Sequence, residues 1–110
     1  LESLGIEIIK TKNDNGKVSL KDLMRILGEE KNIDSIYVEG GASLHASLLK
    51  ERLVNKALIY IAPKIFGGFK AKSPIGGEGI KEPENALKLS NGSITKIDED
   101  LFLEYYINYK

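Results

Sequence analysis

The sequence contains no cysteine and no tryptophan, and it has one histidine. Without cysteine the chain forms neither disulfides nor thiolate metal sites, and a single histidine argues against a zinc site. Neither sign of charge is in excess, because 16 Lys and Arg residues balance 16 Asp and Glu residues. We therefore expect no bound metal and no general electrostatic attraction to nucleic acid or to an anionic membrane.

Long apolar runs and targeting signals are also lacking. No segment approaches the ~20 apolar residues that cross a bilayer. The start, Leu1–Gly5, has neither the basic segment nor the apolar core of a signal peptide. It also lacks Met, so we expect the chain to begin inside a longer protein, with the cytoplasm as its compartment. With 110 residues, 42% of them hydrophobic, the chain is expected to form one domain at most.

The first third of the chain predicts a strand, a turn and a helix. Ile6–Lys10 is a short β-branched run typical of a strand, and residues 13–16 read Asn-Asp-Asn-Gly, a turn cluster. Ser19 is expected to be the N-cap of a helix, with Asp22 as a capping-box partner. Gly28 is the expected end of that helix.

The middle of the chain predicts a parallel βαβ unit. Ser35–Val38 is a compact apolar segment, a helix is expected from Ala42, and Ala57–Ala62 is almost continuously apolar. Such a continuous run is typical of a strand that is covered on both faces. A crossover of this kind joins parallel strands with a right-handed turn.

The last third predicts a loop followed by an antiparallel hairpin. Residues 63–80 contain two Gly-Gly pairs and no regular periodicity, which indicates a long loop. Leu87–Ile97 and Leu101–Tyr109 have the composition of strands, and Asp98–Asp100 is the expected turn between them.

Glu39-Gly40-Gly41 joins the first apolar segment of the βαβ unit directly to the expected helix. A helix N-terminus presents unpaired N–H groups and a partial positive charge, and glycine lets a phosphate approach the backbone. The side chains of Ser43 and Ser47 are candidate additional donors. The G-x-G-x-x-G fingerprint is absent, so the spacing alone favours a tight turn that binds nothing.

The residues around this turn resemble the C-terminal reductase domain of the bifunctional deaminase/reductase of riboflavin biosynthesis. The likeness covers Tyr37–Leu44, residues 53–56 and Ile61–Gly68, which reads Ile-Ala-Pro-Lys-Ile-Phe-Gly-Gly. Order and spacing agree over nearly the whole chain from Ile6 on. The resemblance implies an α/β fold of dihydrofolate-reductase type, a mixed sheet with the parallel βαβ unit and the C-terminal hairpin. Residues 1–110 are then the C-terminal portion of the reductase domain.

The activity implied by this resemblance is the NADPH-dependent reduction of 5-amino-6-(5-phosphoribosylamino)uracil to its ribitylamino form. A hydride passes from the nicotinamide to the ribose C1′. Glu39 matches the family's substrate-binding acidic residue, and no residue is assigned a catalytic or metal-binding role. For His45 only the backbone is implicated. The residues that match the family's cofactor-binding stretch are Gly40, Gly41, Ala42, Ser43, Leu44, His45, Ala46 and Ser47.

Two other functions remain open at this point. A dihydrofolate reductase shares the fold and a Gly-Gly turn, but the Ala-Pro-Lys-x-x-Gly-Gly segment does not fit it. A non-catalytic dimerisation module, with Tyr105–Tyr109 at an exposed edge, is the alternative outside enzymes. The expected partners are the small pyrimidine ribose phosphate substrate and a second copy of the chain, in a homodimer or larger homo-oligomer. By itself the chain is expected to fold but not to turn over.

Overall fold

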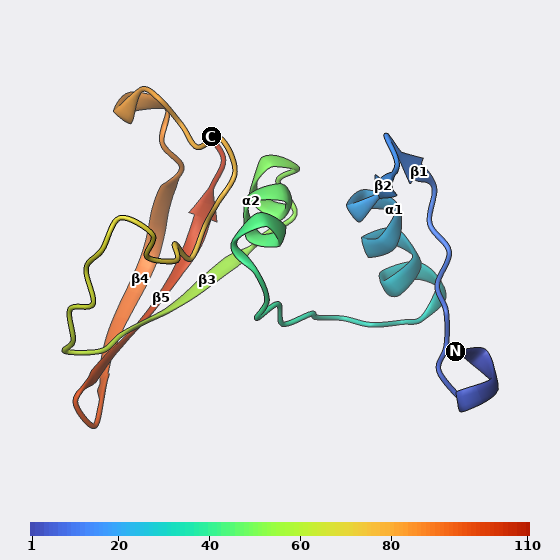
Figure 1. Ribbon diagram of the computed structural model, residues 1–110, viewed down its shortest axis with the longest axis horizontal. Coiled ribbons are helices and arrows are strands. Elements are labelled where there is room, and N and C mark those ends of the chain that lie inside the picture. Colours follow the sequence, from blue (N-terminus) through green and yellow to red (C-terminus); the bar gives the residue numbers. More distant parts are fainter. The chain divides into compact units, whose positions relative to one another are not determined.

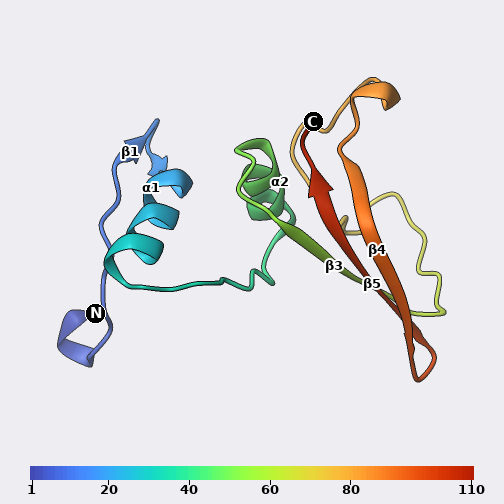
Figure 2. The same ribbon diagram turned by 180° about the vertical axis from the view of Figure 1, so that it is seen from behind.

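The computed structural model describes residues 1–110, which divide into two compact units, Leu1–Glu39 and Gly40–Lys110. Figure 1 and Figure 2 show the same ribbon from opposite sides. A single-turn 3₁₀ helix, Glu2–Leu4, opens the first unit. None of the helices combines the length and the apolar character that a membrane span requires.

A minimal β-hairpin forms at the predicted turn of the first unit. Strands β1 (Asn13–Asp14) and β2 (Lys17–Val18) pair antiparallel. Asn15 and Gly16 between them have φ values of 50° and 80°, as the two-residue hairpin turn that suits Asn-Gly requires. The side-chain oxygen of Asn13 accepts the Gly16 N–H at 2.7 Å. The predicted turn is therefore confirmed.

Helix α1 (Leu20–Arg25) follows, and it continues into a π-helical turn, Ile26–Glu30. Ser19 is its N-cap as predicted, because the Ser19 hydroxyl accepts the Asp22 N–H at 3.3 Å. The predicted end at Gly28 is wrong, since Gly28 lies inside the π-helical turn. The Lys31 N–H, bonded to the Ile26 carbonyl at 3.1 Å, closes the helix instead.

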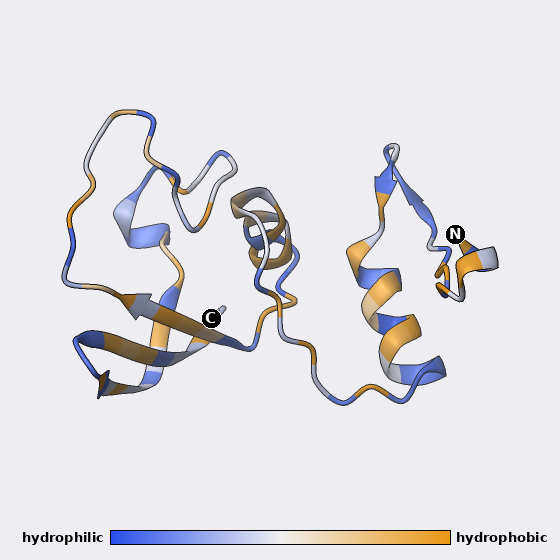
Figure 3. Ribbon diagram, turned by 60° about the horizontal axis from the view of Figure 1, so that its bottom comes forward, coloured by the Kyte–Doolittle hydropathy of each residue, from blue (hydrophilic) through white to orange (hydrophobic).

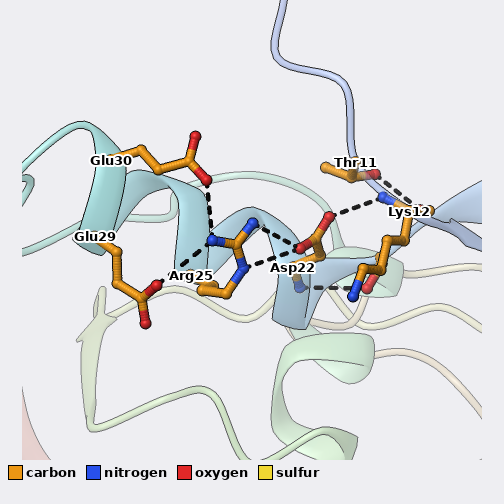
Figure 4. Close-up of polar contacts among 7 residues, drawn as sticks. Thr11, Lys12, Asp22, Arg25, Glu29 and Glu30 are labelled. Carbon is orange, nitrogen blue, oxygen red and sulfur yellow. Dashed lines mark hydrogen bonds and ion pairs between the residues drawn. The ribbon is translucent and has the colours of Figure 1, made fainter.

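A network of charged side chains runs along this helix (Figure 4). The Asp22 carboxylate accepts the backbone N–H of Lys12 at 2.8 Å and contacts the Arg25 guanidinium at 3.2 Å. It therefore ties the helix to the hairpin, and does not complete the predicted capping box. Arg25 also pairs with Glu30 at 2.9 Å and Glu29 at 3.5 Å. These pairs span the turn that contains Gly28.

Acid is expected to loosen the first unit through Asp22. The hydrogen bond from the Lys12 N–H, followed by the bond and charge of Arg25, lowers the pKa of Asp22 below its ordinary value of 3.8. A carboxyl with a lowered folded-state pKa contributes stability above its unfolded pKa, and that stability is lost as the pH falls through the folded value. The helicity of α1, followed by NMR below pH 4, should decline as the pH falls. Asp22→Asn should lower the helicity of α1 at neutral pH and make it less dependent on pH. An unchanged acid profile in Asp22→Asn would contradict the assignment.

Two segments predicted to be strands are not strands. Ile6–Lys10 and Ser35–Val38 have no regular structure. A strand requires a partner for its N–H and C=O groups, and the only sheet of the first unit is the β1–β2 pair. The β-branched composition of Ile6–Lys10 is therefore not sufficient to make a strand.

The second unit begins with helix α2 (Ala42–Lys50), which starts where the sequence predicted. Leu48 is its one buried residue. The connection after α2 is tied to the end of the chain, because the Tyr109 hydroxyl donates to the Val54 carbonyl at 2.9 Å and accepts the Val54 N–H at 3.2 Å. The Ile107 N–H also bonds to the Asn55 carbonyl at 2.9 Å. These bonds anchor the helix-to-strand connection to the sheet.

Three strands form the sheet of the second unit: β3 (Lys56–Ile61), β4 (Lys88–Ile97) and β5 (Asp100–Asn108). Their order is β3-β5-β4, and both pairings are antiparallel. The predicted C-terminal hairpin is confirmed, with Asp98 in the left-handed conformation at φ 51° in its turn. The predicted loop, residues 63–80, is confirmed as well, and a short 3₁₀ turn, Pro83–Asn85, follows it before β4.

The predicted parallel βαβ unit is absent from this structure. β3 is an edge strand that pairs with β5 alone, and the pairing is antiparallel. The apolar run of β3 is visible in Figure 3, yet its side chains are largely exposed, for example Tyr60 at 59% and Ile61 at 49%. The expectation that both faces of β3 are covered is wrong for this chain, because most of the β3 side chains are exposed. Only Ile26 and Leu48 are buried, with exposed fractions of 7% and 4%.

Candidate functional site

The glycine turn before α2 leaves a group of backbone donors free. Gly41 is the N-cap residue, with φ 81° and ψ 128°, and no side chain caps the helix. The first backbone bond of the helix runs from the His45 N–H to the Gly41 carbonyl, at 3.1 Å. The N–H groups of Ala42, Ser43 and Leu44 make no backbone hydrogen bond. The first turn also has no acidic residue, so neither a capping side chain nor a carboxylate of that turn opposes an anion.

The glycines themselves are open to a ligand. At Gly40 and at Gly41, the position where a Cβ would stand has no heavy atom within 4 Å. The φ of Gly41 lies in the region that side chains rarely adopt, so glycine is required by the backbone there. The donors and the space that a phosphate group needs are therefore both present at this turn.

The two serines of the helix differ in availability. The Ser47 hydroxyl donates to the Ser43 carbonyl at 3.0 Å, so its proton is used within the helix. The Ser43 hydroxyl has no partner and is exposed. Of the two side chains expected to supply extra donors, Ser43 is the one that is free to do so.

Glu39 is the last residue of the first unit, and it is exposed. Its carboxylate forms no hydrogen bond or ion pair with another residue. Being next in sequence to Gly40, it adjoins the glycine turn through the backbone. Its contact with a substrate stays a prediction.

The loop around Gly76 contacts the helix, which the sequence did not indicate. His45 is half-buried, and its Nδ1 lies 2.9 Å from the Pro74 carbonyl oxygen. The Gly76 N–H donates to the Ala42 carbonyl at 2.9 Å. The only sequence signal for this contact is the Gly76-Gly77 pair, one of the two pairs that indicate the loop.

Other parts of the molecule have fewer features of a binding site. A shallow groove in the first unit lies between residues 7–10 and the side chains of Ile26, Glu30 and Lys31, and the Lys31–Glu7 ion pair joins its two walls. No cluster of His, Asp or Glu side chains is placed to hold a metal ion.

Comparison with known proteins gives a consistent result. A family model described as the RibD C-terminal domain matches residues 2–103. The riboflavin biosynthesis protein RibD of Actinobacillus pleuropneumoniae is 46% identical over 104 residues, which are 94% of this chain and 27% of that protein. A 2,5-diamino-6-ribosylamino-4(3H)-pyrimidinone 5′-phosphate reductase of Methanothermobacter thermautotrophicus is 37% identical over 75 residues, 68% of this chain and 35% of that protein. The chain thus spans about a quarter of the length of the RibD relatives it matches.

Solved structures agree at the level of the fold. RibD of Acinetobacter baumannii superposes with a TM-score of 0.75 at 22% identity, covering 84% of this chain and 27% of that one. The Saccharomyces cerevisiae riboflavin biosynthesis reductase Rib7 gives 0.67 at 27% identity, covering 93% and 43% of the two chains. The expected fold class, α/β of dihydrofolate-reductase type, is confirmed, although the parallel pairing within it is not formed here.

Proposed function

Because the chain belongs to the RibD C-terminal domain family, we propose that it is the C-terminal portion of an NADPH-dependent reductase of riboflavin biosynthesis. The proposed reaction converts 5-amino-6-(5-phosphoribosylamino)uracil to 5-amino-6-(5-phosphoribitylamino)uracil. The resemblance to the reductase domain of the bifunctional deaminase/reductase implies this substrate, and the methanogen relative is named for a diaminopyrimidinone phosphate. Both compounds are pyrimidines that carry a ribose phosphate.

The observation that carries the proposal is the set of free N–H groups at the start of α2. Ala42, Ser43 and Leu44 present three adjacent donors with no protein acceptor. Gly40 and Gly41 leave open space in front of them. The pyrophosphate of a dinucleotide fits both the charge and the geometry of such a turn. The residues present are thus suited to the cofactor that the family implies.

When bound, NADPH supplies the hydride for the reduction. The part of this chain is to bind and orient: residues 41–47 hold the phosphates, and the exposed Ser43 hydroxyl adds one side-chain donor. Holding the cofactor in a fixed orientation raises the rate of hydride transfer, because the two reactants no longer depend on a chance encounter.

We propose that Glu39 contacts the substrate rather than the cofactor. A carboxylate accepts hydrogen bonds from hydroxyl and amino groups, and the ribosyl and pyrimidine parts of the substrate carry both. A carboxylate close to a pyrophosphate would instead be repelled. The charge of Glu39 therefore favours the substrate over the cofactor as its partner.

A chimeric enzyme tests the function and the role of Glu39 together. In it, this chain replaces the matched segment of the Actinobacillus pleuropneumoniae relative, and NADPH oxidation is followed with each pyrimidine phosphate. Glu39→Gln is expected to lower kcat/KM more than about fivefold, since a hydrogen bond to a charged group contributes about 1.5–3 kcal/mol. The dissociation constant for NADPH should barely move.

Glu84→Gln is the matched control, because Glu84 is an exposed carboxylate outside the turn, and it should leave both constants unchanged. Loss of NADPH affinity with normal substrate kinetics would assign Glu39 to the cofactor instead. Turnover of dihydrofolate by the unsubstituted chimera would contradict the proposed reaction. The absence of turnover with either pyrimidine phosphate would contradict it as well. The homo-oligomer and the cytoplasmic location stay predictions.

A further inference from the structure

The loop 73–79 is attached to the first two turns of α2 by two hydrogen bonds. One joins the Gly76 N–H to the Ala42 carbonyl oxygen at 2.9 Å. The other joins His45 Nδ1 to the Pro74 carbonyl oxygen at 2.9 Å. A carbonyl oxygen only accepts, so Nδ1 carries the proton in this contact. The loop therefore bonds to one backbone group and one side chain of the same stretch of helix.

Gly77 allows the loop to come this close. A Cβ added there would lie 3.0 Å from the Ala46 Cβ, whereas one added at Gly76 would meet Ala42 at an ordinary contact distance of 3.4 Å. Gly77 also has φ +76°, which disfavours any side chain. Ser73 braces the bend, because its hydroxyl donates to the Ile75 carbonyl at 2.8 Å and accepts the Ile75 N–H at 3.3 Å. The close approach is thus encoded by residues at both ends of the contact.

The loop orders the start of the helix without using the N–H groups of its first turn. A side chain at the N-cap would order the first turn, but it would occupy an N–H group that a phosphate needs. Gly41 provides no such cap, and an uncapped helix end frays. The loop contacts act on the Ala42 carbonyl and the His45 side chain, so they hold the turn and leave its N–H groups free.

We propose that His45 is a positioning residue that latches loop 73–79 onto α2 and so preorganises the donors of the dinucleotide's phosphate site. This inference rests on the proposed function, because the ligand is the cofactor proposed there. Ordering the turn before binding removes that cost from the binding free energy. The imidazole acts through the loop and does not itself touch the cofactor.

The test uses the 110-residue chain itself, labelled with ¹⁵N and titrated with NADPH. His45→Ala removes the latch, and the dissociation constant should rise about two- to tenfold, the range that one hydrogen bond of 0.5–1.5 kcal/mol gives. Amide exchange at Gly76 should quicken in the same variant, while the β4–β5 hairpin keeps its protection. His45→Asn should restore both, because its amide nitrogen stands close to the place of Nδ1. Lys50→Ala, an exposed change at the other end of α2, is the control and should alter neither.

The outcomes separate the latch from the site it serves. If the unsubstituted chain binds NADPH and His45→Ala binds it equally well, the latch is wrong and the proposed cofactor site stands. If NADPH shifts no amide resonance of residues 41–47 in the unsubstituted chain, the cofactor site is overturned and the latch with it. Faster exchange at Gly76 with unchanged affinity would assign His45 to loop stability alone and would also overturn the inference.

Discussion

Replacing Gly92 with alanine is expected to destabilise the β4–β5 hairpin by about 1–3 kcal/mol, the usual cost of forcing an extra carbon into a packed position. A methyl group at this position would overlap the ring of Tyr105. The ring belongs to the facing strand, so the overlap is relieved only by moving that ring or opening the ladder. Either change removes contacts that hold the hairpin together.

A β-bulge explains why the ring covers this glycine. The register shifts between Ser90, opposite Tyr106, and Ser93, opposite Glu104. Asn91 and Gly92 therefore face Tyr105 as two residues against one, which is the arrangement of a bulge. Asn91 takes the left-handed conformation there, with φ 50°. The bulge places the backbone of Gly92 directly beneath the aromatic ring.

Urea unfolding followed by tyrosine fluorescence measures this effect, since the chain has five tyrosines and no tryptophan to mask them. Asn91→Gly is the matched control, because glycine adopts the same φ without strain, and its midpoint should stay near that of the unsubstituted chain. An equal midpoint for Gly92→Ala would mean that Tyr105 moves aside freely, contrary to the packing described.

The local features of this fold could be predicted because they depend on a few neighbouring residues. Asn15-Gly16 suits a two-residue hairpin turn, and Ser19 supplies a cap within its own helix turn. The start of α2 after Gly41 follows from the same kind of signal. Each of these needs only contacts within about four residues of sequence, so composition is enough to specify them.

Strand pairing could not be predicted in the same way. The apolar run Ala57–Ala62 correctly indicates a strand, but its partner residues in β5 lie 40 or more positions later in the sequence. An apolar run is also equally compatible with a parallel or an antiparallel neighbour, and nothing within the run distinguishes them. Ser35–Val38 is long enough and apolar enough for a short strand, yet it has no pairing partner and forms no strand.

The candidate site shows the same division. Its backbone donors follow from a strand-like segment, two glycines and a helix, all contiguous. The latch is formed by His45 and Pro74, which are 29 residues apart, and no periodicity links them. A lone histidine on a helix gives no sign of its partner before the loop is folded.

Replacing Gly41 with valine is expected to raise the dissociation constant for NADPH at least tenfold, which corresponds to about 1.4 kcal/mol. Two effects act together. The side chain would stand between the pyrophosphate and the free N–H groups of Ala42, Ser43 and Leu44, and a φ of 81° is strained for any side chain. The same ¹⁵N titration measures the loss, with the resonances of α2 reporting whether the helix still forms.

Gly40→Ala separates the two effects. Gly40 does not have a positive φ, and its Cβ position is open, so alanine fits the protein without strain. Any rise in the dissociation constant then reports the approach of the ligand alone. Gly28→Ala, also in open space but in the first unit, is the control and should leave affinity unchanged. A phosphate site at this turn predicts a loss for Gly41→Val and a smaller loss for Gly40→Ala. Unchanged affinity in Gly41→Val, with α2 intact, would place the cofactor elsewhere.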